Sequence, residues 1–209
     1  VEALAALGAV DFLMWVVTGI STGLTQGFSI QLSQYYGAKD FENLRKSLAH
    51  SYRLTAFIAA GVLILSQSFA SLVLTGLHTP SNIIGMSLLY LRIIFCGIPA
   101  TAAYNMFASA LRAMGNSKTP LTAMIIASVL NVSLDILFVA GFGWGVAGAA
   151  IATVIAQSFS AVYCFLILRR IDIVHLTRAD FMPASGMNAR LMKLGIPVVF
   201  QNIIIGVGG

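Results

Sequence analysis

The sequence has 209 residues, of which 58% are hydrophobic and 9% charged, with a mean hydropathy of +0.91 and a formal net charge of +5. Soluble domains carry about 25% charged residues, so this composition excludes a water-soluble globular protein. The basic residues are scattered between long apolar runs without interleaved aromatic side chains, which argues against nucleic-acid binding. Cys96 and Cys164 lie inside apolar runs, a pattern that favours neither a disulfide framework nor a metal centre.

The first apolar run covers residues 4–32 and is long enough to cross a hydrocarbon core of about 30 Å with some tilt. Gly19, Gly23 and Gly27 recur at four-residue spacing, which predicts a flat stripe where another helix can approach closely. Asp11 lies about two turns inside this run.

A polar link over residues 38–46 follows, and Asp40 is a candidate N-cap for the next helix. The second predicted span covers residues 54–77, preceded by a partly amphipathic turn that holds His50 and Arg53. A proton relay is one interpretation of His50. Its position near a helix end among basic residues favours an interfacial side chain instead.

The third predicted helix covers residues 82–114 and contains Arg92, Pro99 and Asn105. Its interior proline removes a backbone hydrogen bond and predicts a kink. The fourth and fifth spans lie within residues 117–170 and are joined by a glycine-rich turn at 141–145, which predicts an antiparallel helical hairpin.

Three oxygen-bearing side chains fall at similar depth in this hairpin. Counted from the turn at about 1.5 Å per residue, Asp135 lies roughly 9 Å inside, Thr153 about 12 Å and Asn131 about 15 Å. Asn131 and Asp135 are four residues apart, so they project from one helical face. A carboxylate in hydrocarbon costs at least ~2.5 kcal/mol, so Asp135 predicts a cation or proton site in a membrane transporter. The structural alternative is that Asn131 and Asp135 only hydrogen-bond neighbouring helices.

The chain divides into a bundle of five complete spans over residues 1–170, a polar linker over 171–189 and a sixth apolar segment that starts at residue 190 and is broken by Pro197. The sequence does not begin with Met and stops inside this apolar segment, so we expect a fragment of a longer protein.

The basic residues give an orientation. Eleven of the 12 lysines and arginines follow the first, third or fifth predicted span, and therefore lie on one side of the membrane. The positive-inside rule makes that side cytoplasmic. Arg92 is the exception: it is placed inside the third span, where it either pairs with Asp11 or extends toward the outer headgroups.

Four sequence blocks together resemble the multidrug and toxic compound extrusion (MATE) family of secondary transporters. They are residues 34–40 (QYYGAKD), 110–120 (ALRAMGNSKTP), 131–135 (NVSLD) and 143–153 (GWGVAGAAIAT), and their order and spacing are more specific than any one of them. The resemblance covers essentially the whole chain.

This resemblance implies an all-α membrane protein, a polytopic helical bundle in which the chain supplies helices two to six of the first six-helix lobe and the start of helix seven. The missing first helix and the second lobe would be partners within the same protein. It also implies export of small organic cations or drugs across a bacterial cell membrane in exchange for Na⁺ or H⁺, by alternating access and without a cofactor. Asn131, Asp135 and Thr153 match positions that bind the coupling cation or proton. The positions that match the substrate cavity are Asn105, Met124, Ser128 and Ala156.

Other function classes fit the residues less well. A flippase for lipid-linked precursors would need a basic patch inside the membrane, whereas Arg92 is the only basic residue predicted there. An intramembrane enzyme would need a nucleophile–base pair or a metal cluster, and the predicted spans contain neither. A non-transporting scaffold subunit would leave the cost of burying Asp135 unexplained.

Overall fold

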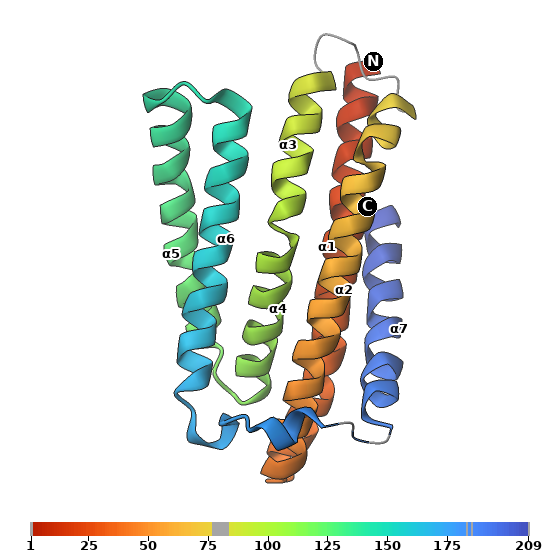
Figure 1. Cartoon of the computed structure of the whole chain (residues 1–209), viewed down its shortest axis with the longest axis vertical. Coiled ribbons are helices and arrows are strands. Elements are labelled where there is room, and N and C mark those ends of the chain that lie inside the picture. The colour runs from red at the N-terminus through yellow and green to blue at the C-terminus, as the bar shows by residue number, and fades with distance from the viewer. Residues whose placement is uncertain (1, 77–83, 183, 185, 209) are drawn as a thin grey trace.

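The computed structural model is an elongated bundle of helices that run alongside one another (Figure 1). It describes residues 2–76, 84–182, 184 and 186–208, and the side chains among them except those of residues 2–14, 16, 73 and 206–208. The described chain is helical with no strand, which confirms the predicted all-α fold.

The helices follow the predicted spans. Their bounds are α1 Glu2–Gly37, α2 Phe41–Gly76, α3 Ile84–Cys96, α4 Ile98–Ala113, α5 Lys118–Asp135, α6 Gly145–Arg169 and α7 Met187–Gly208, with a π-helical segment η1 at Ile136–Gly141 and two 3₁₀ turns, η2 at Asp172–Val174 and η3 at Arg178–Phe181. Among the described residues, four stretches are long and apolar enough to cross a membrane: α2, α3 with α4, α5 with η1, and α6. Figure 1 shows the α5–α6 hairpin on one side of α4 and the α1, α2 and α7 helices on the other.

The link between α1 and α2 forms a tight turn that starts α2. Asp40 Oδ1 accepts the backbone N–H of Asn43 at 3.2 Å, and Oδ2 accepts the side-chain amide of the same residue at 2.7 Å. These hydrogen bonds hold the pKa of the Asp40 carboxyl below its ordinary value, because they stabilise the charged form. The predicted N-cap is therefore confirmed.

The third predicted span is divided at Gly97 into α3 and α4, with Pro99 in the first turn of α4. This confirms the predicted effect of the interior proline, which cannot donate a backbone hydrogen bond. Gln67 of α2 reaches the break and donates to the carbonyl oxygen of Arg92 at 2.9 Å. One of the two interpretations of Arg92, that it pairs with Asp11, lies outside the described side chains.

Helix α7 packs closely against α1 along the predicted glycine stripe. A Cβ added at Gly27 would lie 2.3 Å from the Cα of Gly195, and one at Gly23 would lie 2.7 Å from the Cα of Val199. The prediction that Pro197 breaks this helix is wrong, since α7 runs from Met187 through Pro197. Its backbone on both sides of the proline is held against α1, which offsets the lost hydrogen bond.

The predicted linker is folded onto the start of α2. Asp180 is buried and accepts hydrogen bonds from the backbone and hydroxyl of Thr177, while Arg53 donates to the carbonyl of Phe181 at 3.1 Å. His50 is also buried: its Nδ1 lies 2.7 Å from Asn188 Oδ1 and its Nε2 lies 3.1 Å from the carbonyl oxygen of Met182. Residues far along the chain therefore cover His50, and its two interpretations, a proton relay or an interfacial side chain, stay predictions.

Candidate functional site

The α5–α6 hairpin brings Asn131 and Thr153 into contact. The Asn131 side-chain amide donates to the Thr153 hydroxyl oxygen at 3.4 Å, and that hydroxyl donates to the backbone carbonyl of Ala149 at 3.0 Å. Small residues of α6, including Ala149, let α5 approach closely enough for this contact. The structure thus brings into contact two side chains that the sequence places at similar depth in the hairpin.

Asp135 lies one helical turn further toward the hairpin loop. It is half-buried, and its Oδ1 atom is fully buried without a hydrogen-bond partner among the described residues. An unpaired buried carboxylate oxygen costs more free energy than an ordinary lost hydrogen bond. The structure thus places Asp135 beside Asn131 on α5, but with no hydrogen bond to Asn131 or Thr153.

The helix changes character directly after Asp135. Residues Ile136–Gly141 form a π-helix, a wider turn that is often found at functional sites. The ring of Phe138 in this segment packs with those of Phe142 and Trp144 after it, with centroids 5.1 to 6.1 Å apart, and this aromatic cluster closes the hairpin. The sequence carries no periodic signal for the π-helix, since an apolar run fits either helix type.

A cavity of about 190 Å³ lies beside the Asn131–Thr153 contact, and we refer to it as the α5–α6 cavity. It is lined by residues of α4, α5 and α6: Tyr104, Met124, Ala127, Ser128, Asn131, Thr153, Ala156, Gln157 and Ser160. Three of the four residues predicted to face a substrate cavity, Met124, Ser128 and Ala156, line it. Asn105 does not line the cavity, whereas the preceding residue, Tyr104, does. Successive residues of a helix point about 100° apart, so the two side chains face different directions.

Sequence reasoning missed three polar lining residues, Tyr104, Gln157 and Ser160. Two of them carried a usable signal. Gln157 and Ser160 follow Thr153 by four and seven residues, so all three fall on one face of α6.

The lining side chains offer hydroxyl and amide oxygens, with the carboxylate of Asp135 on the next turn. Neutral oxygens with a single carboxylate suit a monovalent cation that is bound and released better than a tightly held divalent ion. No group of three His, Cys, Asp or Glu side chains that could hold a metal occurs among the described residues. The arrangement therefore offers one carboxyl group at Asp135 and neutral hydroxyl and amide oxygens on the neighbouring turns.

The family model of MatE matches residues 1–137 of this sequence. The chain belongs to the MatE family. Two curated relatives from Bacillus subtilis (strain 168) match over 98% of the chain: "Probable multidrug resistance protein YoeA", 28% identical, and "Probable multidrug resistance protein YpnP", 31% identical. The "Multidrug export protein MepA" of Staphylococcus saprophyticus is 24% identical over 93% of the chain. The chain spans about half the length of these MatE relatives, 43 to 46%.

Solved MatE structures share this fold. A crystal structure of MATE in complex with MaL6 superposes with a TM-score of 0.91 at 23% identity, covering 99% of this chain and 46% of that one. Inward-facing and outward-facing conformations of a multidrug resistance MATE family transporter each match with a TM-score of 0.89 at 24% identity, over 99% of this chain and 47 and 46% of theirs. The fold is thus that of a MatE multi-pass membrane protein, from α1 through α7.

Proposed function

We propose that the full-length protein is a secondary active antiporter that exports organic cations or drugs in exchange for Na⁺ or H⁺ by alternating access. In this proposal the coupling ion or proton binds at Asp135, Asn131 and Thr153, and the α5–α6 cavity is part of the substrate path. The resistance and export functions in the names of the MatE relatives support the substrate class.

The observation that carries the proposal is the buried, unpartnered Oδ1 of Asp135. A carboxylate that only tied helices together would be expected to have a hydrogen-bond donor from a neighbouring helix. A cation or proton that binds and dissociates would satisfy this oxygen only while it is bound. Competition between the two at one carboxylate is the basis of exchange, because each bound species must leave before the other binds.

The alternative functions receive less support. A flippase for lipid-linked precursors would need several basic side chains facing a cavity, whereas the α5–α6 cavity has no basic lining residue. A scaffold subunit would not need an unsatisfied carboxylate oxygen beside an amide–hydroxyl pair.

The experiment replaces Asp135 with asparagine in the full-length protein and measures export of ethidium from loaded vesicles under an imposed Na⁺ or H⁺ gradient. Asparagine keeps the size of the side chain but removes its charge and its titration, so we expect coupled export to fall to background under either gradient.

Ser133→Ala is the matched control. Ser133 is exposed on the same helix and its hydroxyl donates to the backbone of Val129, so export should be unchanged. Undiminished export by the Asp135→Asn protein, at the expression level of the control, would contradict the proposal. Comparing the two gradients on the unmodified protein identifies the coupling ion.

A further inference from the structure

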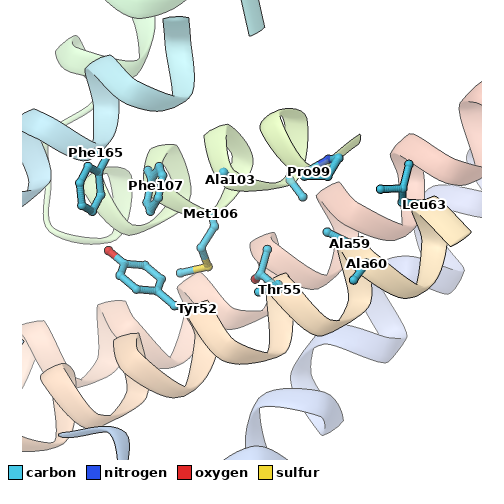
Figure 2. Close-up of a pocket in the computed structure, with 12 residues that line it drawn as sticks. Tyr52, Thr55, Ala59, Ala60, Leu63, Pro99, Ala103, Met106, Phe107 and Phe165 are labelled. Carbon is cyan, nitrogen blue, oxygen red and sulfur yellow. The ribbon is translucent and has the colours of Figure 1, made fainter. Parts of the chain in front are cut away.

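A second cavity lies between α2, α4 and α6, and its chemistry is unlike that of the α5–α6 cavity. Its volume is about 360 Å³, and we refer to it as the α2–α4 groove. It is lined by Tyr52, Thr55, Ala56, Ala59, Ala60, Leu63, Pro99, Ala102, Ala103, Met106, Phe107 and Phe165. Only Tyr52 and Thr55 among these carry a polar side-chain atom. Figure 2 shows the lining residues of α2 facing those of α4.

The groove is long and has two different ends. At one end three aromatic rings meet: the centroids of Tyr52 and Phe107 are 5.4 Å apart, and those of Phe107 and Phe165 are 5.2 Å apart (Figure 2). The other end is aliphatic, at Leu63 and Pro99 (Figure 2). Eleven residues separate Tyr52 from Leu63, so the groove extends about 16 Å along α2. That length matches the hydrocarbon depth of one leaflet, about 15 Å, or half of the ~30 Å core.

The aromatic end lies near the basic end of the bundle. Arg169 is exposed one helical turn beyond Phe165 on the same face of α6, and Arg53, which also donates to the Phe181 carbonyl, follows Tyr52 on α2. The positive-inside rule assigns this end to the cytoplasm, where the leaflet contains anionic lipids. Aromatic side chains such as Tyr52 are typical of the boundary between headgroups and hydrocarbon.

The groove also contains an unsatisfied polar group. Thr55 is 8% exposed, and its hydroxyl oxygen is buried without a hydrogen-bond partner among the described residues. Threonines elsewhere in these helices satisfy their hydroxyls on the carbonyl four residues earlier, as Thr122 does. Because this oxygen is not accessible from the groove, it adds no polar surface there, and a ligand in the groove meets a lining that is apolar apart from Tyr52.

We propose that the α2–α4 groove binds one acyl chain of an anionic phospholipid of the cytoplasmic leaflet, with the headgroup held by arginines at the aromatic end. The apolar lining and leaflet-matched length fit an acyl chain. The basic rim favours a phosphate and disfavours the organic cations proposed for the α5–α6 cavity. This site is distinct from the proposed transport path and does not depend on it.

The test uses the full-length protein in vesicles that contain phosphatidylglycerol with a photoactivatable diazirine on its acyl chain. After illumination, mass spectrometry of peptides locates the label. We expect it on residues 56–63 of α2 and 99–107 of α4. Phosphatidylcholine with the same acyl chain should label these residues at least threefold less, because it lacks the net negative charge.

Two substitutions fill the groove, Ala60→Phe and Ala103→Phe, and each should lower its labelling by at least fivefold. Ala140→Phe is the matched control: Ala140 is exposed in η1 and lines neither cavity, so labelling should be unchanged.

The proposal would be overturned by label spread evenly over the outside of the bundle, by equal labelling from both lipids, or by labelling that the filling substitutions leave intact. Displacement of the label by ethidium would also overturn it, since the groove would then belong to the transported substrate. The readout requires no transport, so its failure is separate from failure of the proposed antiport.

Discussion

The α5–α6 cavity and the α2–α4 groove share two helices but differ in chemistry. Both contain residues of α4 and α6, yet hydroxyl and amide side chains surround the first, and alanines and aromatic rings the second. On α6 the change occurs within five residues, from Ser160 to Phe165. One pair of helices therefore lines two cavities of different polarity, because the faces of a helix carry independent sequences.

The largest expected effect comes from filling the polar cavity. Ser128 lines it from α5, and Ser128→Phe would occupy much of its roughly 190 Å³. We expect at least a tenfold loss of ethidium binding to the full-length protein, measured by fluorescence, with lipid labelling of the α2–α4 groove unchanged. Ser133→Phe, on the exposed side of the same helix, is the control. If Ser128→Phe lowered both ethidium binding and lipid labelling, the two cavities would not be independent.

A smaller effect should follow from removing one oxygen of the proposed ion site. Thr153→Val keeps the shape of the side chain but removes the hydroxyl that accepts the Asn131 amide. Losing one hydrogen-bonding oxygen corresponds to about a threefold to tenfold loss of affinity for the coupling ion. We therefore expect the Na⁺ or H⁺ concentration that half-activates export to rise by the same factor. Thr122→Val, whose hydroxyl is exposed and bonds only its own helix, should leave that concentration unchanged. If the half-activating concentration is unchanged in Thr153→Val, Thr153 is not part of the ion site.

The smallest expected effect concerns stability. Ser160 is buried at the polar cavity, where its hydroxyl lies 3.2 Å from the carbonyl oxygen of Ala156 and 3.5 Å from that of Ala123, joining α6 to α5. Ser160→Ala should lower the free energy of unfolding by about 1 kcal/mol, measured by denaturant titration in detergent micelles. The exposed Ser133→Ala should change it by less than about 0.5 kcal/mol. Equal effects would mean that the α5–α6 contact does not depend on this hydroxyl.

The sequence predicted the parts of the fold that depend on local patterns. Hydropathy located the spans, Asp40 marked the start of α2, and Pro99 marked the break between α3 and α4. The Asn131–Thr153 contact was also predictable, because a short turn fixes which residues of a helical hairpin lie at one depth.

Features that depend on distant residues were not predictable. His50 is buried by Met182 and Asn188, more than 130 residues later, and nothing near His50 indicates this. Pro197 is tolerated because α1 supports the helix around it. The π-helix after Asp135 has no sequence signature, although it alters which way the following side chains project. Asn105 does not line the α5–α6 cavity, whereas the preceding residue, Tyr104, does, and its predicted contact with substrate stays a prediction.

The backbone contact between Gly27 and Gly195 has a mechanical consequence. With no side chain between the two helices, α7 cannot slide or roll on α1 without first separating from it. Buried contacts at Gln31–Met187 and His50–Asn188 secure the same helix at its start. We therefore expect α1 and α7 to move together as one unit, with little bending at the polar linker.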